Sequence, residues 1–196
     1  MPDLLAGRLP MPQSSLLAAL SALVPLARLP RTGWVMSGVA APESIAAHAH
    51  GVSLLALALG PRVEPALDVD RAVALAAVHD APEALLTDLP RTASKLLPAG
   101  AKRAAEQAAA QALLPPLSDL AQARFDEYLA EETREARFTR LCDKLHMGVM
   151  LVAYTRAGTR GLEEFGASLA ALDCSEFSPC EALQEELLSA YRELRS

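Results

Sequence analysis

The sequence is poor in aromatic side chains, which make up only 4% of its 196 residues. Apolar residues nevertheless make up 52% of the chain, so its core has to be built mainly from Ala, Leu and Val. Ala and Leu are the strongest apolar helix formers, and no stretch shows the alternation of apolar and polar residues that is typical of strands. The composition therefore predicts an all-α fold, and the length suits one domain with a sizeable core.

Cysteine is scarce as well. The sequence has three cysteines, Cys142, Cys174 and Cys180, and none of them forms a CxxC pair. An odd, sparse set excludes a disulfide framework or a zinc knuckle and is typical of a reduced, cytoplasmic protein. We expect the three thiols to behave as small buried hydrophobic groups.

An excess of positive charge and long apolar runs are also missing. The formal net charge is −6, which argues against binding to a nucleic acid polymer, because such binding needs a basic surface. The apolar run at 52–60 is too short to cross a membrane, which takes roughly twenty residues. Pro25 and Arg28 interrupt the apolar stretch near the N-terminus, so we expect neither a signal sequence nor a membrane partner.

Prolines, glycines and helical periodicity divide the chain into elements. Residues 1–13 contain three prolines and predict a loosely ordered arm, whereas 14–196 predict one helical domain. Within that domain, 29–42 and 95–98 are expected to be loops. Apolar residues at helical spacing predict helices at 14–28, 43–59, 68–80, 100–114, 117–131, 132–154, 162–172 and 179–195, with a short helix starting near Pro82.

Four polar residues occupy helix faces that should be buried. His48 lies within an apolar stripe, and Asp80 continues the apolar row of the next helix, with His79 beside it. Asp143 lies in register with apolar residues of a later helix. One unpaired group of this kind costs several kcal/mol and could still be a hydrogen-bonded core residue. Four together favour a divalent cation, for which Mn²⁺, Co²⁺, Mg²⁺, Fe²⁺ and Zn²⁺ suit a mixed nitrogen and oxygen ligand set, with positions left open for substrate.

Three parts of the sequence carry a resemblance to a known family. They are 29–35 (LPRTGWV) with 42–48 (PESIAAH), then 78–90 (VHDAPEALLTDLP), and finally 136–145 (ARFTRLCDKL). In their order and spacing the chain resembles the HD-domain phosphohydrolase superfamily and, within it, the 5'-deoxynucleotidases. The resemblance implies a single-domain HD-type helical bundle with four metal ligands, which are His48, His79, Asp80 and Asp143.

The same resemblance implies roles for residues around the metal. Glu83 is expected to be the acid/base near the attacking water, and Asp88 its acidic companion. Arg31 is expected to clamp the substrate phosphate, and Trp34 to shape the pocket. The chemistry fits, because a guanidinium suits an anionic phosphomonoester and a carboxylate close to Asp80 can orient or deprotonate water. From the residues alone, Glu83 and Asp88 could equally cap the two ends of a short helix.

Two residues depart from the family pattern. Ala47 stands where family members usually carry an acidic residue, and Thr87 stands where they usually carry glycine. Neither change removes a metal ligand. We expect these positions to affect the support of the ligands or the shape of the pocket, and therefore substrate preference more than hydrolysis.

Two further histidines lie near the predicted ligands in the sequence. His50 points about 200° around the helix from His48, so we expect it to be solvated or to contact another helix rather than the ion. His146 shares a helix face with Asp143 and could reach the site as a supporting group or a spare ligand, or simply fill the core.

Together these features predict a metal-dependent phosphomonoesterase that converts (deoxy)nucleoside 5'-monophosphates to nucleoside and phosphate. A nucleoside triphosphate or alarmone hydrolase on the same scaffold is one alternative, and it would release pyrophosphate or triphosphate. A catalytically idle HD-fold binding module is another, although the intact Glu83 and metal ligands count against it. A homodimer is expected from the family and from the Ala/Leu-rich helix at 100–114, whose apolar area exceeds what one domain is expected to cover.

Overall fold

The computed structural model describes residues 15–195, within which every regular element is helical and an isolated antiparallel bridge joins Pro30 to Ser44. The predicted all-α fold is therefore confirmed, while the arm predicted at 1–13 lies outside the described residues. In chain order the elements are α1 (Leu16–Leu23), the 3₁₀ turn η1 (Val24–Ala27), α2 (Thr32–Met36), α3 (Ile45–Leu59), the 3₁₀ turn η2 (Gly60–Arg62), α4 (Val69–Val78), α5 (Glu83–Leu86), α6 (Arg91–Ser94), α7 (Ala101–Leu113), α8 (Asp119–Ala130), α9 (Arg134–Arg156), α10 (Glu163–Ala170) and α11 (Ser178–Glu193).

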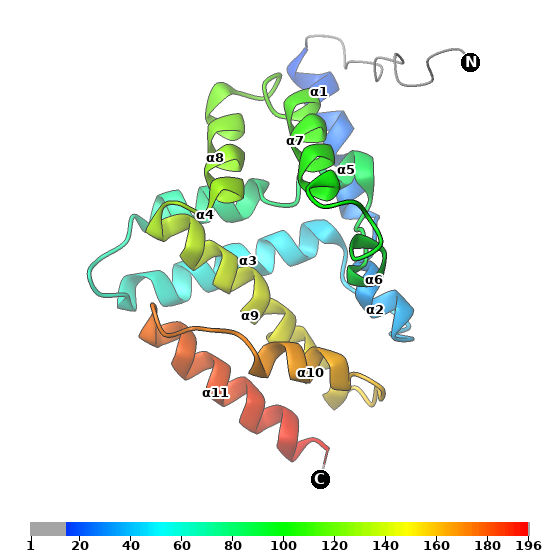
Figure 1. The fold of residues 1–196 in the computed structure, drawn as a ribbon, viewed down its shortest axis with the longest axis vertical. Coiled ribbons are helices and arrows are strands. Elements are labelled where there is room, and N and C mark those ends of the chain that lie inside the picture. The colour runs from blue at the N-terminus through cyan, green and yellow to red at the C-terminus, as the bar shows by residue number, and fades with distance from the viewer. Residues whose placement is uncertain (1–14, 196) are drawn as a thin grey trace.

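Three helices form the centre of the molecule. Helix α3 packs along α4, and the long helix α9 contacts both of them (Figure 1). Each begins at a side chain that accepts a hydrogen bond from a backbone N–H of the first turn, namely Ser44, Asp68 and Thr133. Such caps satisfy N–H groups that would otherwise have no partner in the helix. The starting points of the helices that carry the candidate site are therefore set by local sequence.

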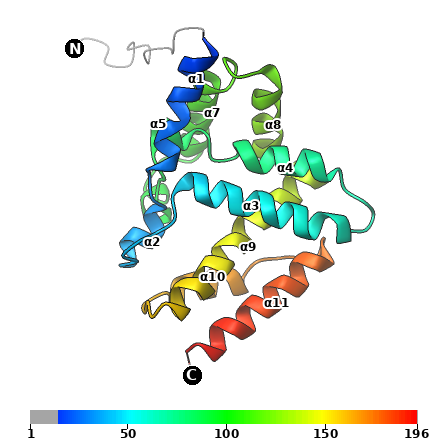
Figure 2. The same cartoon turned by 180° about the vertical axis from the view of Figure 1, so that it is seen from behind.

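Two hydrophobic clusters lie on either side of this centre. The larger one joins α3, α4 and α9 to α10 and α11, and it contains Phe138, Leu145 and Phe177. The smaller one joins α7 and α8 and contains Leu113 and Phe125. Seen from behind, α1 and α7 lie at one end of the molecule and α11 at the other (Figure 2). The central helices are thus packed from both ends.

The structure corrects two of the predicted boundaries. The helix expected at 14–28 ends at Leu23 and continues as the 3₁₀ turn η1, because Pro25 has no N–H to donate and its ring disturbs the preceding turn. The segment 29–42 is not entirely a loop, since it contains α2. A five-residue helix is too short to show an apolar periodicity, and α2 depends on contacts with another part of the chain, described below.

Several expectations about buried groups can be compared with the fold. Cys142, Cys174 and Cys180 are free and buried, as expected. The apolar face of α7 is buried, with Ala110 and Leu113 in the smaller cluster. That face is therefore covered within the chain, and it gives no reason to expect a dimer. Between residues 15 and 195 there is no helix that is both long and apolar enough to cross a membrane.

Candidate metal centre

The four predicted metal ligands meet where α3, the end of α4 and α9 come together. His48 lies on α3, His79 and Asp80 follow the last residue of α4, and Asp143 lies on α9. Ligand atoms of His48, His79 and Asp143 all lie within 4.8 Å of one another. Oδ2 of Asp80 lies 3.9 Å from Nε2 of His48 and 3.1 Å from Nε2 of His79. Such separations suit one cation with bonds of about 2.1 Å to nitrogen and oxygen.

His79 has a ring nitrogen that is buried without a hydrogen-bond partner. Its Nδ1 lies 2.7 Å from the carbonyl oxygen of Ala76, which can only accept, so the proton is on Nδ1. Nε2 then carries a lone pair, and the protein offers this atom no hydrogen bond although Asp80 is close. A buried polar atom without a partner is costly. A divalent cation would satisfy it, and the residues present therefore fit such an ion.

His48 and Asp143 form the most buried pair of the site. Nε2 of His48 lies 3.0 Å from Oδ1 of Asp143, and the imidazole is completely buried. Burial opposes protonation, but the interactions of the ring with Asp143 and Glu43 raise the pKa of His48 to about 9. Burial also disfavours the charged form of Asp143, yet the charge of Lys144 and the hydrogen bond with His48 hold the pKa of this carboxyl well below its usual range.

Two neighbours orient the Asp143 carboxylate. Nζ of Lys144 lies 2.9 Å from Oδ2, and the hydroxyl of Tyr128 on α8 lies 3.4 Å from the same oxygen. Because both groups contact Oδ2, Oδ1 is left facing His48. Sequence reasoning assigned no role to either residue. Tyr128 lies three residues after Phe125 on an apolar face, a pattern that predicts a core position, and only its phenol hydroxyl signals a polar partner.

Arg31 reaches into the site from the segment before α2. Its Nη1 lies 3.1 Å from Oδ2 of Asp80, 3.7 Å from Oε2 of Glu83 and 3.7 Å from Oδ1 of Asp88. Its backbone N–H donates to the carbonyl of Glu43 at 3.0 Å, as part of the bridged pairing that precedes α3. The guanidinium thus meets the predicted metal ligand Asp80 and both predicted catalytic carboxylates, and it balances part of their charge.

Glu83 lies at the start of α5, three residues after Asp80. Its side chain is buried, and Oε2 has no hydrogen-bond partner. Burial and the nearby charge of Asp80 raise the pKa of Glu83 to about 9. Raised pKa values are common for carboxyl groups that transfer protons at active sites. From the residues alone, Glu83 could instead have capped the short helix. In the structure the N-cap residue of α5 is Pro82, and no side chain forms a capping hydrogen bond, so this alternative is not seen.

Asp88 is hydrogen-bonded to the start of α2. Its Oδ2 accepts a hydrogen bond from the backbone N–H of Thr32 at 2.6 Å, and its carbonyl accepts from the Thr32 hydroxyl at 2.7 Å. These two bonds hold the first turn of α2 and, with it, the neighbouring Arg31. They also explain why α2 forms although its sequence carries no helical signal.

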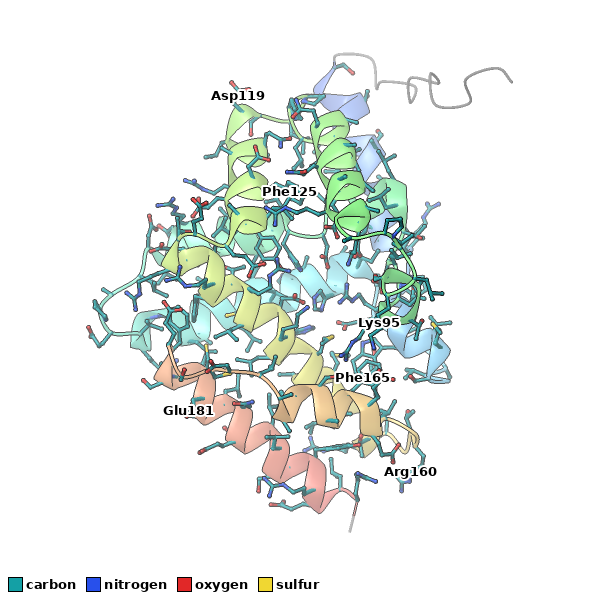
Figure 3. All side chains as sticks on the ribbon, viewed as in Figure 1. Lys95, Asp119, Phe125, Arg160, Phe165 and Glu181 are labelled. Carbon is teal, nitrogen blue, oxygen red and sulfur yellow. The ribbon has the colours of Figure 1, made fainter. Side chains whose placement is uncertain are left out.

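A cavity of about 880 Å³ opens beside these residues. Its lining includes Arg31, Asp80, Glu83 and Asp143, together with apolar side chains from α8 and α10. Figure 3 shows two of the latter, Phe125 in the upper half of the view and Phe165 in the lower half. The volume falls in the range of small-molecule sites, about 300 to 1,000 Å³.

Trp34 forms part of the wall of this cavity rather than an exposed contact. The indole is 1% exposed, stacks on Phe165 with ring centroids 4.0 Å apart, and donates from Nε1 to Oε1 of Glu43 at 3.2 Å. Its expected part in shaping the pocket agrees with this position. Because the indole is buried, it is not placed to contact substrate directly.

Glu43 and His146 lie next to Nδ1 of His48, and neither of them lines the cavity. Nδ1 of His146 lies 3.0 Å from Nδ1 of His48, and Glu43 places carboxylate oxygens 3.6 Å and 3.7 Å from these two nitrogens. Burial, and then the charge of His48, lower the pKa of His146 to about 4. His50 is exposed, as expected. Glu43 had no assigned role in the sequence, where it was only the first residue of the helix predicted at 43–59; in the structure it precedes α3.

Known proteins are similar to this chain over most of its length. A family profile described as an HD domain matches residues 25–172. The chain is 30% identical to a 5'-deoxynucleotidase of Schizosaccharomyces pombe, over 77% of this chain and 79% of that protein. It is also 30% identical to a 5'-deoxynucleotidase of Xenopus laevis, over 93% and 88% of the two chains. A crystal structure of a protein from Pyrococcus horikoshii superposes with a TM-score of 0.74 at 31% identity, covering 90% of this chain and 98% of that one. The chain therefore belongs to the HD-domain family, and it is an enzyme of that family similar to the 5'-deoxynucleotidases.

Proposed function

We propose that this enzyme is a metal-dependent phosphomonoesterase that hydrolyses deoxynucleoside 5'-monophosphates to nucleoside and phosphate. The observation that carries the proposal is the convergence of His48, His79, Asp80 and Asp143, with the lone pair of His79 Nε2 buried and unpartnered among them. The names of the similar proteins from yeast and frog support the choice of substrate. A divalent cation held by these residues would neutralise phosphoryl charge and make nearby water more acidic.

Arg31 is the residue best placed to hold the substrate phosphate. Its guanidinium lies at 3.1 Å from Asp80 and lines the cavity, so a phosphoryl group bound next to the ligands would meet it. Arginine can bind two phosphate oxygens at once, which fixes the direction of the ester bond as well as its position. The bridge between the segments before α2 and α3 keeps Arg31 in this place.

Glu83 is the residue best placed to move the proton. In the reaction a bond forms between water oxygen and phosphorus, the bond from phosphorus to the 5' oxygen breaks, and the nucleoside leaves with a proton. Glu83 accepts a proton from the attacking water or supplies one to the leaving oxygen. Its pKa of about 9 arises from burial and from the charge of Asp80, and a cation beside Asp80 would lower it toward neutrality.

The charge of the cavity favours a monophosphate over a longer phosphate chain. Its lining contains five basic and six acidic side chains. Four of the basic ones already lie close to carboxylates, since Arg31 pairs with Asp80, Lys144 with Asp143, Lys102 with Glu106 and Arg140 with Glu131. One divalent cation would compensate the charge of a monophosphate but not that of a triphosphate.

A phosphate-release screen tests this proposal. Deoxynucleoside and ribonucleoside mono- and triphosphates are offered to the purified protein with Mn²⁺, Co²⁺, Mg²⁺ or Zn²⁺, and the products are identified by chromatography. We expect orthophosphate and nucleoside from deoxynucleoside monophosphates. Release of pyrophosphate or triphosphate would favour the nucleoside triphosphate or alarmone hydrolase instead. Metal binding without hydrolysis of any nucleotide would favour an idle binding module.

Two finer expectations belong to the same proposal. We expect the enzyme to act in the cytoplasm, because its three buried cysteines are free thiols. We also expect a homodimer, on the basis of family resemblance alone. Light scattering at working concentration measures the mass directly, and a monomeric mass would contradict the dimer.

A further inference from the structure

The second ring nitrogen of His48 faces another histidine. Nδ1 of His48 lies 3.0 Å from Nδ1 of His146 on α9, a hydrogen-bond distance. The nearest carboxylate oxygen, Oε1 of Glu43, lies 3.6 Å from the same nitrogen, which is too far for a hydrogen bond. His48 is completely buried, so water does not replace this contact. His146 is therefore the hydrogen-bond partner of this nitrogen.

If His48 is a metal ligand, its Nδ1 is the donor in this hydrogen bond. An imidazole that gives its Nε2 lone pair to a cation carries its single proton on Nδ1. That N–H needs an acceptor, and the lone pair on Nδ1 of His146 supplies it when the proton of His146 is on Nε2. His79 solves the same problem differently, because its Nδ1–H meets the carbonyl of Ala76 at 2.7 Å.

The surrounding structure holds His146 in this position. A Cβ atom on Gly51 of α3 would lie 1.9 Å from Nε2 of His146, so the ring lies directly against the backbone of α3 where a side chain is missing. On the other edge, Oε2 of Glu43 lies 3.7 Å from Nδ1. Glu43 is itself fixed by Trp34 Nε1 at 3.2 Å and by its own N–H, which donates to the Tyr154 hydroxyl at 2.8 Å.

We propose that His146 is a positioning residue for the metal ligand His48. It accepts the hydrogen bond from Nδ1–H of His48, fixes the tautomer in which the Nε2 lone pair faces Asp80 and Asp143, and sets the orientation of the ring. Gly51 provides the space that the His146 ring needs. This inference rests on the metal site of the proposed function, but it does not depend on which substrate is hydrolysed.

Metal affinity tests the proposal without reference to activity. Co²⁺ is titrated by calorimetry into metal-stripped protein, with the visible spectrum of the ion recorded in parallel. His146→Leu keeps a side chain of similar size but offers no acceptor, and we expect Co²⁺ affinity to fall about 10- to 100-fold with a changed spectrum. His146→Asn places an amide oxygen near the position of Nδ1 and is expected to restore most of the affinity. His50→Leu makes the same change at an exposed histidine and should leave affinity unchanged.

The tautomers can also be read in the unmodified protein, which removes any dependence on the folding of variants. The chain has four histidines, and long-range proton–nitrogen spectra of the Zn²⁺-loaded protein distinguish their ring nitrogens. We expect His48 to be protonated on Nδ1 and His146 on Nε2 only. A proton on Nδ1 of His146 would overturn the proposal.

The remaining outcomes separate this inference from the proposed function. Equal Co²⁺ affinity in wild type and His146→Leu would overturn the positioning role while leaving hydrolysis intact. Two bound ions in wild type, falling to one in His146→Leu and Glu43→Gln, would also overturn it, because His146 would then be a ligand of a second ion. A protein that shows the expected affinities and tautomers but hydrolyses no nucleotide would contradict only the proposed function.

Discussion

At the scale of single residues, the different surroundings of Glu83 and Asp80 suit their carboxyl groups to different roles. The close contact with His79 and the positive charge of Arg31 keep the pKa of Asp80 low despite burial, so Asp80 is a carboxylate that suits a ligand. Glu83 lies only three residues later, yet its Oε2 is buried without a hydrogen bond and its pKa is raised. Glu83 is therefore suited to exchange a proton rather than to hold a cation.

Replacing Glu83 with glutamine separates these two roles. We expect Glu83→Gln to bind Mn²⁺ or Co²⁺ nearly as well as wild type, because no ligand is lost, and to release phosphate about 10² to 10⁴ times more slowly. The paired measurements are a metal titration and the rate of phosphate release. Glu106→Gln changes another acidic residue of the cavity wall, one paired with Lys102, and should remain close to wild type. A fully active Glu83→Gln would exclude Glu83 as the proton-transfer group.

The backbone of Thr87 is strained. Its backbone has φ 60° and ψ 169°, a conformation that is reached almost exclusively by glycine and costs about 1 to 3 kcal/mol in other residues. The family resemblance led us to expect glycine at this position, so the departure from that expectation coincides with a strained turn. The turn leads directly into Asp88, which is bonded to Thr32 through both side chain and backbone.

We expect Thr87→Gly to stabilise the protein. The Thr87 side chain is exposed, so little packing is lost, and the relief of strain outweighs the added flexibility of glycine, by about 1 kcal/mol. Chemical denaturation measures the free energy of unfolding. Thr92→Gly, at an exposed position within α6, makes the same replacement without strain and should destabilise instead. An equal loss of stability in both variants would show that Thr87 is not strained.

At the scale of elements, the long helices were predictable, whereas among the short ones only α5 was, because Pro82 marks its start. Asp68 was predicted to start α4, and it does so by accepting the N–H of Arg71. His48, Asp80 and Asp143 stood out because each interrupts an apolar face, and the structure brings them together with His79. Helix α2 gave no comparable signal, since it is held by Asp88, which lies 56 residues away in the chain.

The supporting residues of the site were missed for a related reason. Glu43 and Tyr128 do not break a periodic pattern, so nothing in the sequence relates them to His48 or Asp143. Only packing brings Glu43 next to His48 and places the Tyr128 hydroxyl at Asp143. A sequence therefore reveals polar groups that are costly where they lie, whereas the groups that compensate them depend on how the helices pack.

Helix α3 and helix α9 are expected to be sensitive to a single methyl group at their contact. In an exposed helix, replacing glycine with alanine stabilises by roughly 1 kcal/mol. We expect the opposite for Gly51→Ala, because the new Cβ would lie 1.9 Å from the His146 ring and displace it. The variant should lose stability and bind Co²⁺ more weakly than wild type, as measured by thermal unfolding and metal titration.

A second glycine provides the control for this prediction. A Cβ on Gly166 of α10 would lie 2.4 Å from the Tyr191 ring, which is a similar clash outside the site. Gly166→Ala should therefore lower the unfolding temperature without changing Co²⁺ affinity. If both variants lost stability and neither lost affinity, the packing of His146 against α3 would have no bearing on the ligands.

At the scale of the whole molecule, the candidate site lies where the two halves of the fold meet. The larger cluster contains Val52 and Ala76 beside the ligands on α3 and α4, and the smaller cluster contains Ala81, next to Asp80. The ligands are thus supplied by segments that both clusters hold in place. An ion that binds the folded chain and not the unfolded chain stabilises the fold, by about 2.7 kcal/mol when its concentration is 100 times the dissociation constant.

The most direct test of the account is phosphate release from a deoxynucleoside monophosphate by metal-stripped protein before and after a divalent cation is added back. We expect no release from the stripped wild type and recovery on addition of Mn²⁺ or Co²⁺. We also expect no recovery in Asp80→Ala, which removes the carboxylate 3.1 Å from His79 and 3.9 Å from His48. Undiminished turnover by metal-stripped Asp80→Ala protein would contradict the central claim that these residues form the catalytic metal site.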